Sequence, residues 1–176
     1  MELKRAISIN KPREEVYTFW RDFRNLPRFM IHLQDVQVLD ERRSHWATRA
    51  PLDKSDTIEW DAEIVDDRAN ELIAWQSLPG ALVPNQGAVT FAPAPDNRGT
   101  EVRVDMAYEI PGGPVGELIA KLLGEDPKRQ VYDDLRALKQ VLEAGEILLS
   151  DSSIHGRPHP ATTVGQPETP SAKPLL

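Results

Sequence analysis

Few side chains in this sequence combine a type and a spacing that suit acid–base chemistry. Three carboxylates, Glu59, Asp61 and Glu63, alternate along one segment, and a period of two places them on one face of a β-strand. Apolar residues fill the positions between them, so the carboxylate face is expected to meet solvent. Carboxylates on a wet strand face are usually plain surface charge, and we expect neither catalysis nor metal binding there.

The four histidines have no partners that the sequence identifies. His32 and His45 can titrate near neutral pH, but no carboxylate or nucleophile stands at a recognisable spacing from either. His155 and His159 are four residues apart, a spacing at which helical histidines bind metal, yet neighbouring prolines prevent a helix there. The chain has no cysteine, which excludes thiolate metal sites and disulfides. We therefore expect no metal and no cofactor.

The pattern with the clearest functional meaning is apolar. Three strand-like segments each alternate so that their large apolar residues share one face, and these residues are Trp60, Trp75, Met106 and Tyr108. Aromatic side chains with one or two polar groups among them are typical of a small-molecule site. A solid hydrophobic core produces the same pattern, so periodicity alone leaves both interpretations open.

The elements that position these residues follow from periodicity. Seven segments are expected to be strands, at residues 3–9, 34–39, 44–49, 57–65, 71–77, 87–92 and 100–110. After the first strand, Asn10 is a suitable N-cap for a helix over residues 12–22, and a short second helical piece is expected at 28–32. The final helix begins after Pro111–Pro114, is broken or kinked at Pro127, and ends near Gly145.

Two hairpin registers decide which side chains face inward. A tight turn after the strand at 57–65 would pair Ile64 with Ile73 and Ala62 with Trp75. In the hairpin over residues 34–49, inward Val36 and Val38 combined with a simple turn direct His45 inward and Trp46 outward. A β-bulge would reverse that order, and the sequence leaves both arrangements open.

Composition excludes several classes of partner. The net charge is −7 and lies entirely within the first 146 residues, which disfavours binding to nucleic acid or to an anionic membrane surface. No apolar run approaches the length of about 20 residues that a membrane span needs, and the N-terminus lacks the pattern of a signal peptide. We expect a cytoplasmic protein. Residues 147–176 are rich in proline and lack periodicity, so we expect a disordered tail after one domain at 1–146.

Several segments resemble the polyketide cyclase/dehydrase family of the START-like superfamily. The strand-to-helix segment Ile9–Tyr17 and the segment Phe19–Met30 are similar to that family's characteristic motifs, and shorter similarities occur at 43–46, 59–64, 70–75, 99–104 and 133–136. The resemblance implies an α+β helix-grip fold. In that fold a curved seven-stranded antiparallel sheet wraps round a long C-terminal helix, two short helices follow the first strand, and a cavity lies between sheet and helix. Members of the superfamily bind lipids, sterols, quinones or polyketides, and some catalyse cyclisation or dehydration.

From this we expect a protein that binds a hydrophobic small molecule, such as a lipid, a quinone or a polyketide-like compound. The expected lining residues are Phe29 and Met30 at the mouth, then Trp60, Trp75, Met106, Tyr108, Ile119 and Leu122. An alternative is a cyclase or dehydratase, which needs a polar group inside the cavity, and strand parity allows only His45, Ser77 and Tyr108. A third interpretation is a protein-interaction module that uses the final helix and the tail.

Overall fold

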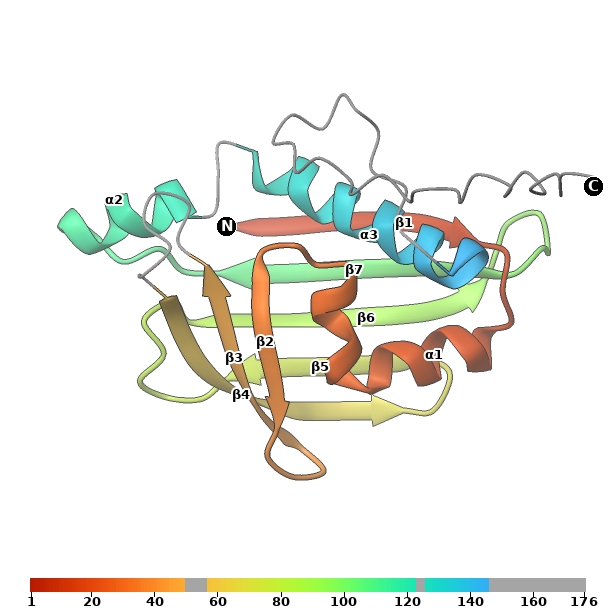
Figure 1. Ribbon diagram of the computed structural model, residues 1–176, viewed down its shortest axis with the longest axis horizontal. Helices are drawn as coiled ribbons and strands as arrows, with labels where there is room; N and C mark the ends of the chain where they lie inside the picture. The colour runs from red at the N-terminus through yellow and green to blue at the C-terminus, as the bar shows by residue number, and fades with distance from the viewer. Residues whose placement is uncertain (50–56, 123–125, 146–176) are drawn as a thin grey trace, which may run out of the picture.

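The computed structural model describes residues 1–49, 57–122 and 126–145 (Figure 1). The expected tail at 147–176 lies outside this part of the chain. The described residues form one antiparallel sheet in the order β1-β7-β6-β5-β4-β3-β2, which confirms the predicted seven-stranded fold. The strands are β1 (Glu2–Ile9), β2 (Leu33–Val38), β3 (Arg43–Arg49), β4 (Thr57–Arg68), β5 (Leu72–Ser77), β6 (Asn85–Pro93) and β7 (Thr100–Tyr108).

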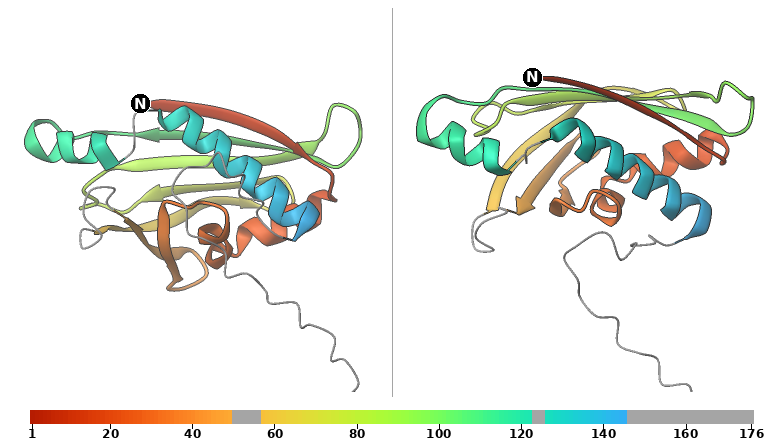
Figure 2. Two further views of the ribbon diagram at one scale, coloured as in Figure 1. Left: turned by 45° about the horizontal axis from the view of Figure 1, so that its top comes forward. Right: turned by 90° about the horizontal axis from the view of Figure 1, so that it is seen from above.

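The helices gather on one side of this sheet. They are α1 (Arg13–Arg21), the 3-10 helix η1 (Phe23–Arg28), α2 (Gly113–Leu122) and α3 (Pro127–Ala144). Figure 2 shows the sheet curving around α3, with α1 and η1 beside it on the same concave side. The apolar stripe of α3 is buried at Leu135, Leu138 and Val141, so this helix closes the core that the curved sheet cannot complete alone.

The C-terminal helical region is divided in two, and the sequence explains where. Asp126 is the N-cap of α3, because its side chain accepts a hydrogen bond from the N–H of Arg129, and Pro127 occupies the first turn. Proline has no N–H to give to a preceding helix, so α3 begins there as a separate helix. Gly145 ends α3 with a φ of 78°, a left-handed conformation that glycine adopts without strain.

Two register predictions were wrong or unresolved, and the structure settles both. Ile64 pairs with Trp75 rather than with Ile73, because a bulge shifts the β4–β5 register between Ile64 and Asp66. The predicted inner face still holds, since Ala62, Ile64, Ile73 and Trp75 are all buried. The observed partner of Ile64 lies two residues from the predicted one, and a shift of two residues keeps the same side chains on the inner face.

The β2–β3 hairpin places Trp46 inside and His45 outside. Val38 pairs with Ser44 and Val36 with Trp46, so Trp46 is buried beside Val36. Of the two arrangements that the sequence leaves open, the structure has the one with Trp46 inward, and the pairing differs by one residue from that of a simple turn. The cause is the turn itself, in which the N–H groups of Leu39 and Asp40 both bond to the carbonyl of Arg43. A shift of one residue moves every side chain of a strand to the opposite face.

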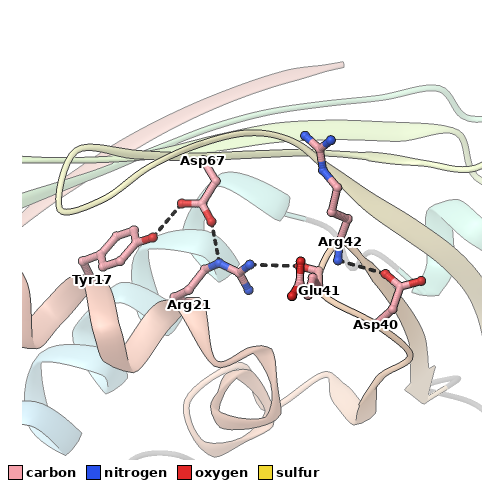
Figure 3. A network of polar contacts seen from close by, with 6 residues as sticks. All are labelled: Tyr17, Arg21, Asp40, Glu41, Arg42 and Asp67. Atoms are coloured by element: carbon pink, nitrogen blue, oxygen red, sulfur yellow. Dashed lines mark hydrogen bonds and ion pairs between the residues drawn. The ribbon is translucent and has the colours of Figure 1, made fainter.

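A polar network fixes α1 to the sheet at the far end of β4 (Figure 3). The hydroxyl of Tyr17 and the Nε of Arg21 donate to the two carboxylate oxygens of Asp67, each at 2.6 Å. Arg21 also donates to the backbone carbonyl of Glu41, at 2.9 Å. Burial and the adjacent Asp67 carboxylate raise the pKa of Tyr17 to about 12, so its hydroxyl remains a donor. The network holds α1 where Trp20 can reach the core.

Candidate functional site

A cavity of about 200 Å³ lies between the inner face of the sheet and helices η1 and α3. Every strand contributes at least one wall residue, β3, β4 and β7 contribute two or more, and most of the wall is apolar. Val83, from the loop between β5 and β6, and Pro127, at the start of α3, also line the cavity. The arrangement is that of a small-molecule pocket, with an apolar body and few polar groups.

Stacked aromatic rings make one side of this cavity rigid. Trp46 stacks on Trp60 with ring centroids 5.8 Å apart, and Phe23 meets Trp46 edge-on at 5.5 Å. Trp20 and Phe29 pack at 5.3 Å on the helical side. The indole N–H of Trp46 donates to the hydroxyl of Ser44 at 2.8 Å, so this buried polar group is already satisfied by the protein.

The floor of the cavity depends on a close approach between Trp75 and Gly87. These residues are paired across β5 and β6, and the indole of Trp75 lies over the glycine. A Cβ atom at position 87 would stand only 2.5 Å from Cζ2 of that indole. The absence of a side chain at Gly87 therefore lets Trp75 lie against the sheet instead of filling the space above it.

Six of the eight expected lining residues lie on the cavity wall: Phe29, Met30, Trp60, Trp75, Met106 and Tyr108. Their contact with a ligand remains a prediction. Phe29 is fully buried, so it forms a fixed part of the cavity wall and does not open or close the mouth. The side chains of Ile119 and Leu122, in α2, lie outside the described part of the structure.

The structure separates the three residues suggested for catalysis. His45 lies on the outer face, where its Nδ1 is 2.7 Å from Oδ1 of Asp61, so it is not the inward polar group that catalysis in the cavity would need. The hydroxyl of Ser77 accepts the N–H of Asn85 at 3.0 Å, and Ser77 is not among the described wall residues. Tyr108 alone lies on the wall; burial raises the pKa of its phenol, and its hydroxyl donates to Sδ of Met1.

Sequence reasoning missed Asp134 as a wall residue. Two adjacent aspartates on a helix usually lie on its surface, yet the half-buried side chain of Asp134 lines the cavity. Burial, followed by the charge of Asp133, raises the pKa of Asp134 to about 7. Its position was visible in principle, because Asp134 stands three residues after Val131 and four before Leu138, within the apolar stripe of α3.

His32 is a further titratable residue of the cavity wall. Burial lowers the pKa of its imidazole, so the ring is neutral at neutral pH. Its backbone carbonyl accepts the hydroxyl of Thr48 at 2.8 Å, which joins the start of β2 to β3. Together, His32, Tyr108 and Asp134 give the wall three groups that can exchange hydrogen bonds with a ligand.

Comparisons with known proteins agree with this geometry. The family model described as "Polyketide cyclase / dehydrase and lipid transport" matches residues 9–136. A crystal structure from Deinococcus radiodurans is 41% identical, with a TM-score of 0.68, and the match covers 82% of this chain and 98% of that one. An uncharacterized 17.2 kDa protein of Streptomyces lincolnensis is 28% identical over 142 residues, which are 81% of this chain and 89% of that protein.

A functionally described protein shares the fold at lower identity. The aromatase/cyclase Zhui from Streptomyces sp. R1128 has a TM-score of 0.64 at 14% identity, over 84% of this chain and 99% of that one. At this identity the likeness concerns the fold alone. Among the helices that the structure describes, none combines the length and apolar character needed to cross a membrane.

Proposed function

Because this chain belongs to the family of polyketide cyclases, dehydrases and lipid-transport proteins, we propose that it binds one hydrophobic small molecule of lipid, quinone or polyketide type. The observation that carries the proposal is the apolar cavity between the sheet and α3. The protein's own side chains leave this space open, although close packing is the rule inside proteins. The stacked tryptophans and Gly87 maintain the opening.

The size of the cavity limits what it can enclose. An apolar cavity of roughly 150 Å³ is known to accept benzene, so a cavity of about 200 Å³ suits a portion of one or two rings. Burying about 200 Å² of apolar ligand surface contributes roughly 5 kcal/mol before the costs of ordering. A dissociation constant of about 0.2 mM or weaker follows for such a fragment. A longer ligand would extend beyond this space.

Native mass spectrometry of freshly purified protein tests this proposal. We expect a population of protein carrying a bound mass, and solvent extraction should release an apolar compound of that mass. Protein that is empty in every preparation, and that also fails to bind one- and two-ring aromatic probes, would refute the proposal. Trp60→Ala removes one wall of the cavity, so this variant should bind such probes more weakly than the wild type does.

A second candidate function is acid–base catalysis of cyclisation or dehydration in the same cavity. The observation in its favour is Asp134, a wall carboxyl whose pKa of about 7 suits both proton uptake and proton release at neutral pH. Neutral His32 and protonated Tyr108 would supply further hydrogen bonds to an enolising carbonyl compound. The aromatase/cyclase fold relative makes a polyketide-like substrate the first to test.

Turnover of such a substrate separates the catalyst from the carrier. If Asp134 transfers the proton, Asp134→Asn should abolish turnover while the substrate still binds, and the exposed neighbour provides a control through Asp133→Asn. Equal turnover in the wild type and in Asp134→Asn would refute the role of Asp134 as the acid–base group. The third interpretation, a protein-interaction module, depends on a tail outside the described residues.

A further inference from the structure

Asp134 gives the cavity a chemical preference as well as a shape. This carboxylate stands on α3 between Val131 and Leu135, and all three residues line the same cavity. Leu135 and Leu138 are buried in the core, so α3 cannot rotate to carry Asp134 away from the cavity. Any ligand that fills the space must therefore meet this carboxyl group or leave it facing an apolar surface.

The remaining wall holds nothing that would neutralise a carboxylate. Among the wall residues that the structure describes there is no lysine or arginine, and the other polar side chains are those of His32, Thr48, Asn85, Tyr108 and Gln130. Burial favours the neutral form of His32. The nearest charge along the helix, Asp133, is also negative.

The ligand must then satisfy the carboxyl group. An ionised carboxylate only accepts hydrogen bonds, and a buried one without a donor is costly. A hydroxyl or ammonium group on the ligand would supply the donor through a charge-assisted hydrogen bond. A ligand carboxylate would instead place two like charges in a poorly solvated space, which disfavours ionisation of both.

We infer that the cavity selects an apolar ligand bearing a hydroxyl or amine donor and discriminates against ligands bearing a carboxylate. This inference rests on the proposed binding function and adds the chemical class of the ligand. Under it, fatty acids and other aromatic or aliphatic acids are poor ligands, whereas phenols, alcohols and amines of matching size are good ones.

Three naphthalene probes of nearly equal size test the inference on the full chain: 2-naphthol, 2-naphthylmethylamine and 2-naphthoate. Isothermal titration at pH 8, where Asp134 is mostly ionised, should show the naphthol and the amine binding at least about tenfold more tightly than the acid, a difference of about 1.4 kcal/mol. Asp134→Asn should reduce that ratio to within about threefold. Asp133→Asn, on the exposed side of the helix, should leave the order unchanged.

The outcomes separate this inference from the proposed function. If 2-naphthol binds and 2-naphthoate binds as tightly, the ligand class is refuted while hydrophobic binding stands. The same holds if Asp134→Asn keeps the full preference of the wild type. If no probe binds to the wild type, the proposed function and this inference fail together. Thermal unfolding of each variant confirms that a lost preference reflects the carboxyl group and not an unfolded protein.

Discussion

Gly87→Ala is the substitution that most sharply tests how the cavity is kept open. Gly87 pairs with Trp75 on one side and with Met106 on the other, and both partners line the cavity. The added Cβ would lie 2.5 Å from Cζ2 of Trp75 and 2.9 Å from Cε2 and Cη2. Ordinary carbon contacts are about 3.5–4.0 Å, so the indole must move by about 1 Å into the cavity.

The expected cost is that of overpacking a well-fitted site, about 1–3 kcal/mol of unfolding free energy. At about 2–4 °C of melting temperature per kcal/mol for a domain of this size, Tm should fall by roughly 2–12 °C. Because the ring moves into a space of only about 200 Å³, binding of 2-naphthol should also weaken by more than about tenfold. Calorimetry of unfolding and titration of the probe measure the two effects separately.

Two further variants control this experiment. A Cβ at Gly112 would meet nothing within 4 Å, so Gly112→Ala should leave both stability and probe affinity near those of the wild type. Trp75→Phe combined with Gly87→Ala should recover part of the lost affinity, since a smaller ring fits beside the new methyl group. Unchanged affinity and stability in Gly87→Ala alone would refute the role given to this contact.

Two other predictions concern charged groups. Burial raises the pKa of Asp134 from its ordinary value of 3.8 to about 7 in the folded protein. The folded state therefore retains a proton that the unfolded chain loses, and the free energy of unfolding should fall as pH rises from about 4 to 7. Asp134→Asn should remove this loss, so at pH 8 the variant should be more stable than the wild type by up to about 4 kcal/mol. At pH 4 the two proteins should differ little. Chemical denaturation at both pH values measures the difference in unfolding free energy, and an equal difference at both would contradict the raised pKa. Asp67→Asn should weaken the bonds to Tyr17 and Arg21 and cost about 1–2 kcal/mol, a value reduced for their partial exposure. The pKa of Tyr17 should also fall from about 12, which ultraviolet titration detects.

The sequence was most informative where structure depends on local periodicity. Alternation identified all seven strands and the inward positions of Trp60, Trp75 and Met106, because the side-chain period of a strand is fixed at two. The break at Pro127 followed equally from the chemistry of proline. The resemblance to a known family then supplied the way the helices and the sheet come together.

Features that depend on register or on distant contacts could not be predicted in this way. The turn that pairs Val38 with Ser44 reversed the faces of His45 and Trp46, and a sequence of polar turn residues does not determine such a choice. Asp134 was hidden because a pair of adjacent aspartates on a helix is usually surface. The contact of Trp75 with Gly87 joins two strands, so neither residue alone indicates it.

A crystal structure of the protein soaked with 2-naphthol would show directly whether the cavity holds a ligand. We expect one probe molecule between the sheet and α3, in contact with Trp60 and Trp75, with its hydroxyl within hydrogen-bond distance of Asp134. A cavity closed by the protein's own side chains, with the probe absent or held only on the outer surface at saturating concentration, would contradict it.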